Sequence, residues 1–161
     1  VLSTAAVALP RTFIAASTGV FGLLFTTAIA GAFVAGLDAG LMYNTFPYMG
    51  DTIVPEEYSE MTPMWRNMFE NGAAVQFNHR VLGVTSVAAV SSLWLYSRYL
   101  PLPPQARIAM NLLGAMGWIQ ASLGVATLLW LVPTPLAASH QAGSLVSISL
   151  TLFLLQQAVR T

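Results

Sequence analysis

Four long stretches of this sequence carry no charge in their middle, and this feature constrains the fold more than any other. A helix needs about 20 mostly apolar residues to cross a bilayer. Prolines fall at the joints between the stretches, where residues that interrupt helices are tolerated. The chain is 56% hydrophobic and 7% charged, whereas about a quarter of the residues of a soluble domain are charged. We therefore expect an all-α membrane protein with four transmembrane helices, over residues 12–36, 77–99, 107–132 and 136–159.

The expected spans form one antiparallel bundle, a single domain over residues 1–161, because successive helices reverse direction at each joint. Both termini then lie at one end of the bundle, and all acidic residues lie at the other end. An excess of arginine marks the side that faces the cytoplasm or the mitochondrial matrix. Four of the six arginines flank the end with the termini: Arg11, Arg98, Arg107 and Arg160. We therefore expect both termini on the matrix or cytoplasmic side.

The connection between the first two spans, residues 37–76, is long and polar and is expected on the outer side. Within it, Thr62 is placed to cap a short helix with Pro63 at its first position, and Asn71-Gly72 is placed to end that helix. A helix lying on the membrane surface and a lid packed on the bundle explain its apolar face equally well. That face comprises Met61, Met64, Trp65, Met68 and Phe69.

The chain has two histidines, and both lie near the outer end of an expected span. His79 is the third residue of the second span, and His140 is the fifth residue of the fourth. These two spans run parallel, and a helix rises 1.5 Å per residue, so the imidazoles lie within about one turn of the same depth. This geometry suits two axial ligands of one heme iron. The alternative is a pair of interfacial histidines bonded to backbone and water.

Arg80 follows His79 and is the expected charged partner of such a cofactor. Heme propionates are anionic, and a guanidinium group pairs with anionic oxygens. The alternative is an arginine that reaches out to the membrane boundary. Two nitrogen ligands alone would make a poor zinc site. Polar side chains that could bond the second ring nitrogens stand nearby in the sequence: Gln76, Asn78, Ser139 and Gln141.

Other candidate residues point less clearly to chemistry. Glu56, Glu57 and Glu60 are typical of a solvated loop face, because no histidine or cysteine accompanies them. Asp38 suits a cap or a turn. The chain shows no phosphate loop, catalytic triad or nucleic-acid-binding patch, and the lack of cysteine excludes disulfides and thiolate metal sites. Three residues of the third span either line a ring-shaped cavity or pack against helices and lipid: Trp118, Gln120 and Trp130.

Three segments together resemble the C-terminal half of the heme A synthase family, membrane enzymes of cytochrome c oxidase assembly. They are "GAFVAGLDAGLMYNTFPYMGD", "RNMFENGAAVQFNHRVLGVTS" and "VPTPLAASHQAGS". The resemblance runs from about Arg11 to the end of the chain. The first segment and the lack of loop cysteines resemble the mitochondrial and proteobacterial branch of the family. The expected location is therefore the mitochondrial inner membrane, with a bacterial plasma membrane as the alternative.

Members of this family are built from two similar four-helix halves, each with a histidine pair. The resemblance implies that this chain is the heme b-binding half, with His79 and His140 as iron ligands and Arg80 beside the propionates. The other half is taken to hold heme o, whose ring methyl is oxidised to a formyl group. The family usually has an acidic residue before the first histidine. Asn78 stands there in this chain and removes a possible carboxylate partner.

The chain lacks the second histidine pair and the acidic residue of the N-terminal half. We therefore expect no catalytic residue of the oxidation here, and we expect a partner that supplies a second four-helix half. Because the first residue is Val1 rather than Met, we expect a processed chain or a piece of a longer one. Two other readings stay open: a non-enzymatic heme-binding subunit of a respiratory complex, and a heme-free structural membrane subunit. We expect membrane lipid to surround the bundle.

Overall fold

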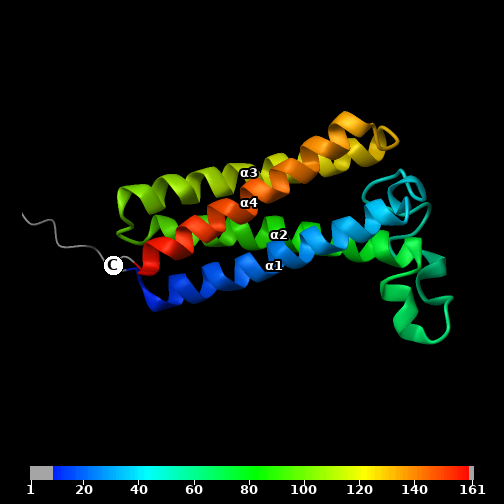
Figure 1. The fold of residues 1–161 in the computed structure, drawn as a ribbon, viewed down its shortest axis with the longest axis horizontal. Helices are drawn as coiled ribbons and strands as arrows, with labels where there is room; N and C mark the ends of the chain where they lie inside the picture. Colours follow the sequence, from blue (N-terminus) through cyan, green and yellow to red (C-terminus); the bar gives the residue numbers. More distant parts are fainter. Residues whose placement is uncertain (1–8, 160–161) are drawn as a thin grey trace, which may run out of the picture.

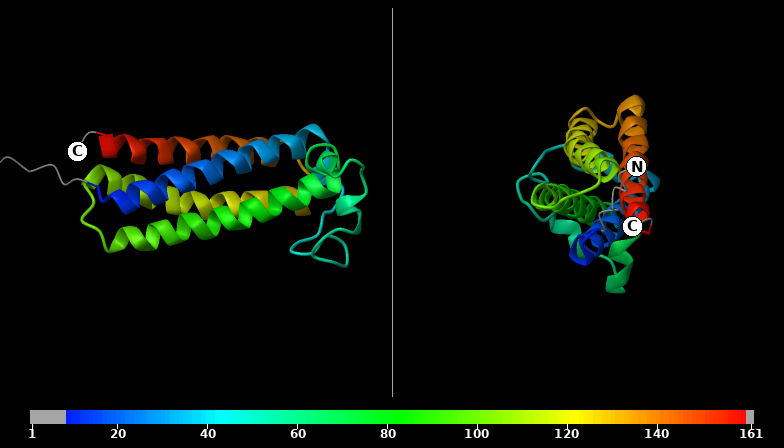
Figure 2. Two further views of the ribbon diagram at one scale, coloured as in Figure 1. Left: turned by 90° about the horizontal axis from the view of Figure 1, so that it is seen from below. Right: turned by 90° about the vertical axis from the view of Figure 1, so that its left-hand side faces the viewer.

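The computed structural model describes residues 9–159. Four long helices pack side by side along most of their length (Figure 1). They are α1 (Arg11–Gly36), α2 (Gly72–Arg98), α3 (Pro104–Leu129) and α4 (Thr134–Val159). Viewed end on, α1 and α3 each lie between α2 and α4, so that α2 and α4 occupy opposite corners (Figure 2). Residues 9–159 contain no β-sheet, which confirms the all-α expectation.

Three of the long helices, α1, α3 and α4, are long and apolar enough to cross a membrane. Large apolar side chains on their outward surfaces are exposed, among them Phe25, Ile108 and Leu145. An apolar surface of this extent is typical of contact with lipid rather than water. The protein is therefore an integral membrane protein. Among the described helices of spanning length, α2 alone is too polar to meet the same criterion.

Individual residues at the helix ends explain where the helices begin and end. Pro104 stands at the first position of α3, where a missing backbone N–H costs nothing. Asn71 caps α2: its side-chain oxygen accepts a hydrogen bond from the amide N–H of Ala74 at 3.2 Å. α2 therefore begins at Gly72, one turn before the expected span. At the other end of α3, Leu131 and Val132 have positive φ angles and turn the chain into α4.

The connection between α1 and α2 holds three short 3₁₀ segments: η1 (Ala39–Leu41), η2 (Glu56–Ser59) and η3 (Met64–Met68). The expectation that Asn71-Gly72 ends the short outer helix is wrong, because Asn71 caps α2 instead. The expectation that Thr62 caps it is also wrong, because Pro63 precedes η3 and no side chain caps that segment. Asn67 explains the tighter turn, since its side-chain amide donates to the carbonyl oxygens of Met61 and Met64.

α1 begins and α4 ends at the same end of the bundle, here called the inner end (Figure 1). The turn between α2 and α3 lies there too, and Arg107 holds it by donating to the carbonyl oxygens of Ser97 and Leu100 at 2.7 and 2.6 Å. The opposite end, which carries residues 37–71, is called the outer end. Arg160 lies outside the described residues. Which end faces the matrix or cytoplasm stays a prediction.

The apolar core occupies the inner half of the bundle. Its buried side chains come from the first turns of α1 and α3 and the last turns of α2 and α4: Phe13, Val20, Val90, Leu93, Ala106, Ala109, Met110, Leu113 and Leu154. In the outer half the interior instead holds glycines, both histidines and polar side chains. The two halves of the bundle therefore have different interiors, and the polar one contains the candidate site.

Candidate functional site

The structure brings the two histidines together inside the bundle. His79 is the eighth residue of α2, and His140 is the seventh residue of α4. Both helices start at the outer end, so the residues lie at nearly equal depth on opposite corners of the bundle. Their imidazoles reach across the diagonal until the ring centroids are 6.4 Å apart, with an angle of 78° between the ring planes.

This separation matches two ligands on opposite sides of one metal ion. An imidazole nitrogen lies about 1 Å from its ring centre and a metal–nitrogen bond is about 2 Å long, so two such rings have centres about 6 Å apart. Among residues 9–159 no group of three or more histidine, cysteine, aspartate or glutamate side chains could hold a metal ion. Two protein nitrogens without further ligands fit an iron whose other four ligands come from a porphyrin.

Several buried polar atoms near the histidines have no hydrogen-bond partner. Such atoms are rare in folded proteins, because an unpaired buried polar group costs about 1–3 kcal/mol. Most of these atoms lie on the histidines themselves, or on residues within about one helical turn of a histidine or of a glycine that contacts one. They are Nδ1 of His79 and of His140, Nε of Arg80, Oε1 of Gln76, both amide atoms of Gln120 and Oγ1 of Thr127. A polar-edged ligand between the helices would give these atoms partners.

Arg80 lies beside the pair and holds the outer connection. Its Nη2 donates to the carbonyl oxygen of Tyr43 at 2.7 Å, and its Nη1 donates to those of Thr45 and Tyr48 at 2.9 and 3.1 Å. Sequence reasoning missed this role, because the three carbonyl groups lie more than thirty residues before Arg80. The Nε atom is buried without a partner, so its N–H group is left for an anionic group.

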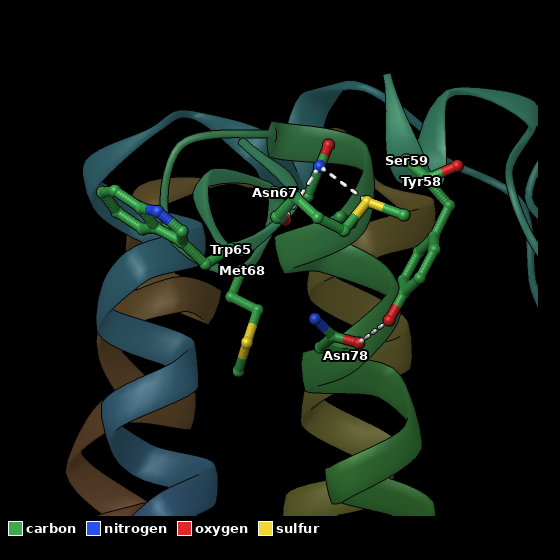
Figure 3. Close-up of a pocket in the computed structure, with 8 residues that line it drawn as sticks. Tyr58, Ser59, Trp65, Asn67, Met68 and Asn78 are labelled. Carbon is green, nitrogen blue, oxygen red and sulfur yellow. Dashed lines mark hydrogen bonds between the residues drawn. The ribbon is translucent and has the colours of Figure 1, made fainter. Parts of the chain in front are cut away.

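Three of the four polar side chains expected to bond the second ring nitrogens have other partners, and the fourth, Gln141, is exposed. Gln76 donates to the carbonyl oxygen of Tyr43 at 3.0 Å, and Ser139 donates to that of Pro135 at 2.7 Å. Asn78 accepts a hydrogen bond from the hydroxyl of Tyr58 at 3.1 Å. This bond lies beside an outer pocket of about 200 Å³ that η3 covers (Figure 3).

Glycines on the neighbouring helices contact the imidazoles instead. A Cβ built on Gly31 of α1 would lie 3.0 Å from Cε1 of His79, and one built on Gly124 of α3 would lie 3.1 Å from Cε1 of His140. Sequence reasoning missed both residues, because glycine is common in membrane helices.

The three residues of α3 considered for a ring-shaped cavity separate into two groups. Trp118 and Trp130 are 62% and 68% exposed, so they face lipid rather than the interior. The side-chain amide of Gln120 is buried, and a Cβ on Gly143 of α4 would clash with its Nε2 atom. Gln120 alone of the three therefore borders the space between α3 and α4.

Tyr43 and Glu57 tie two parts of the outer connection, since the Tyr43 hydroxyl donates to Oε2 of Glu57. This hydrogen bond raises the pKa of Tyr43 to about 12 and lowers the pKa of Glu57 below its usual value. It needs a neutral phenol and an ionised carboxylate. Its contribution to stability is therefore complete from about pH 5 to pH 10, and is lost below that window as Glu57 protonates and above it as Tyr43 ionises.

We expect a spectrophotometric tyrosine titration of the chain to show one group that ionises near pH 12. The Tyr43→Phe variant should lack this late step, because the phenol is gone. The Tyr48→Phe variant leaves the hydrogen bond to Glu57 in place and should keep it. A late step that survives in Tyr43→Phe would contradict the assignment.

Comparison with known proteins agrees with the family resemblance seen in the sequence. The family model described as "Cytochrome oxidase assembly protein", COX15-CtaA, matches residues 2–152. The chain is 53% identical over 142 residues to "Heme A synthase COX15" of Bos taurus, which covers 88% of this chain and 34% of the bovine protein. It is 46% identical over 130 residues to "Heme A synthase" of Nitrosospira multiformis, covering 81% of this chain and 36% of that protein.

A third relative, from Schizosaccharomyces pombe, is named "Heme A synthase-mitochondrial ferredoxin fusion protein" and is 41% identical over 150 residues, covering 84% of this chain and 24% of that protein. The chain thus spans about a third or less of the length of these relatives. No solved structure matches it.

Proposed function

The chain belongs to the COX15-CtaA family of cytochrome oxidase assembly proteins, and we propose that it is the heme b-binding half of a heme A synthase. One observation carries the proposal: two imidazoles face each other across the bundle with centroids 6.4 Å apart. His79 and His140 would hold the heme iron. A bound heme b would supply one-electron transfer there.

The remaining residues of the site hold and shield this group. Arg80 has a buried Nε atom without a partner next to His79, and this donor pairs with a propionate. The other guanidinium nitrogens keep residues 43–48 over the outer end of α2, which limits the access of water to the site. The chain's own groups thus bind, orient and shield, and none of them acts on a substrate methyl group.

Oxidation of the heme o methyl group to the formyl group of heme A requires a second half. The aligned segments make up only 34% and 36% of the two relatives from Bos taurus and Nitrosospira multiformis, and residues 9–159 contain one histidine pair. We place the reaction in a second four-helix half, on a separate chain or on a further part of the same one. A relative fused to a mitochondrial ferredoxin supports an iron–sulfur protein as the electron donor and the mitochondrial inner membrane as the location.

In this proposal all four long helices cross the membrane, α2 included. α2 is less apolar because its outer turns carry Gln76, Asn78, His79 and Arg80, which face the site or the connection above it. Polar groups in a membrane helix are usually found facing such an interior. The excess of arginine at the inner end supports an orientation with both termini on the matrix or cytoplasmic side, and the outer connection would then lie at the opposite membrane surface.

The test is the visible spectrum of the chain purified in detergent, oxidised and reduced, with pyridine extraction to identify the heme. We expect one b-type heme per chain with a low-spin spectrum. A folded chain that stays colourless and binds no added hemin would overturn the proposal and leave a structural membrane subunit. Low-spin heme in a chain that binds respiratory subunits, and no second half, would instead identify a non-enzymatic electron carrier.

A further inference from the structure

The bundle is made of two helix pairs built on one pattern. α1 and α3 each have 26 residues. When they are aligned from their first residues, the buried side chains of α1 match buried side chains of α3. Each helix is also followed, two residues after its end, by a residue with positive φ: Asp38 (50°) and Leu131 (61°). The matched buried pairs are Phe13 with Ala106, Ser17 with Met110 and Val20 with Leu113.

α2 and α4 match in the same way. When His79 is aligned with His140, three buried positions that follow along α2 coincide with buried positions of α4. These pairs are Ser86 with Ser147, Val90 with Thr151 and Leu93 with Leu154. The pair α1–α2 is therefore repeated as α3–α4, and the two histidines occupy equivalent positions in the two pairs.

The glycines that contact the imidazoles obey the same repeat. Gly31 coincides with Gly124 in the alignment of α1 with α3, an alignment fixed without reference to either residue. The backbone carbonyl group of Thr27 lies close to the His79 ring, and that of Gln120 lies close to the His140 ring. Thr27 and Gln120 also coincide, each one helical turn before its glycine. We call each glycine, with this carbonyl group, an imidazole seat.

A side chain at either glycine would displace the ring that it faces. A Cβ on Gly31 would lie 3.0 Å from Cε1 of His79, and a Cβ on Gly124 would lie 3.1 and 3.3 Å from Cε1 and Nε2 of His140. Contacts this short are rare for real Cβ atoms, so each ring would have to move by a few tenths of an ångström. A Cβ on Gly22, elsewhere in α1, would have no neighbour within 4 Å.

We propose that Gly31 and Gly124 are positioning residues that fix the direction of the two histidine rings. Each seat holds the ring that projects from the neighbouring helix of the same pair, with the Cε1 edge of that ring against the glycine. Partners that orient metal ligands in this way change metal affinity about 10- to 100-fold when they are altered. The inference deepens the proposed function and rests on it, but the position of the rings can be measured without heme.

The first measurement uses the heme-free chain and the variants Gly31→Ala, Gly124→Ala and Gly22→Ala. Diethyl pyrocarbonate modifies accessible imidazoles, and mass spectrometry gives the rate at each histidine. We expect Gly31→Ala to change the rate at His79 and leave that at His140 unaltered, and Gly124→Ala to do the reverse. Gly22→Ala is the matched control and should change neither rate.

The second measurement is a hemin titration of the same proteins. Gly31→Ala and Gly124→Ala should each bind hemin about tenfold more weakly, with part of the low-spin spectrum replaced by a high-spin one, whereas Gly22→Ala should bind as the unchanged chain does. A third measurement needs no variant. In detergent micelles, nuclear Overhauser contacts should join Hα of Gly31 to Hε1 of His79, and Hα of Gly124 to Hε1 of His140.

The outcomes separate this inference from the proposed function. Absence of both Overhauser contacts overturns the seats, even if the alanine variants misfold. Unchanged modification rates together with unchanged hemin affinity overturn them as well. If the rates change as expected but the unchanged chain binds no hemin, the seats stand and the heme proposal fails.

Discussion

His79→Ala and His140→Ala each abolish the low-spin heme spectrum, and this is the largest effect that we expect. Either change removes one of the two imidazoles that face each other at 6.4 Å. Residues 9–159 offer no group of three metal-ligating side chains that could replace it. Hemin affinity should fall at least about 100-fold, because loss of a ligand costs more than loss of its orienting partner. A hemin titration followed by absorbance measures the fall.

Two control experiments test whether the loss of the spectrum comes from the loss of a histidine ligand. Gln141→Ala changes the exposed residue beside His140 and should retain the spectrum. His79→Gly leaves space where the ring was, so free imidazole added to this variant should restore the low-spin bands. Single histidine variants that bind hemin as tightly as the unchanged chain, with the same spectrum, would show that the pair does not ligate iron.

Arg80→Leu should loosen the outer connection by about 3 kcal/mol, the second-largest effect. The change removes hydrogen bonds from a charged group to three backbone carbonyl oxygens, and bonds of this kind contribute about 1.5–3 kcal/mol each before water replaces them in part. Hydrogen exchange measured by mass spectrometry should show faster exchange around residues 43–48. The inner halves of the helices should keep their protection, because their apolar core lies far from the change.

Arg66→Leu is the matched control at the same end of the molecule. Arg66 forms an exposed ion pair with Glu70, four residues away, and solvent-exposed pairs of this kind contribute little to stability. Arg80→Lys keeps the charge but loses the planar guanidinium group that bonds several carbonyl groups at once. Its effect on hydrogen exchange should therefore fall between that of Arg80→Leu and that of Arg66→Leu. Exchange around residues 43–48 that is as slow in Arg80→Leu as in the unchanged chain would contradict the role assigned to Arg80.

The four helices were predictable because their signal is local. Uncharged apolar runs bounded by proline indicate each helix, and the start of α1 was placed within one residue. The start of α2 was not, because Asn71 caps it through a side-chain bond that hydropathy does not reveal. The 3₁₀ geometry of η3 escaped prediction for a similar reason, since the Asn67 amide draws the chain into a tight turn.

The meeting of the two histidines was predictable from depth alone, but their surroundings were not. The partners of Arg80 come from a distant segment, and no local pattern links residues 43–48 to it. Gly31 and Gly124 look like other glycines of membrane helices. Their equivalence follows from the helix starts that the structure gives, Arg11 for α1 and Pro104 for α3. The expected spans miss it, because Gly31 is the twentieth residue of the first span and Gly124 is the eighteenth of the third.

The uneven interior of the bundle has a consequence for the order of assembly. Apolar side chains from all four helices pack together at the inner end, whereas buried polar atoms without partners surround the histidine pair in the outer half, on Gln76, Arg80, Gln120 and Thr127 as well as on the histidines themselves. If heme b binds as proposed, a chain with this interior can pack the inner half of its helices before the cofactor binds, because none of the inner core residues belongs to the site. Heme insertion then becomes a late step of assembly, and the part that binds the heme is the last part of the protein to become rigid.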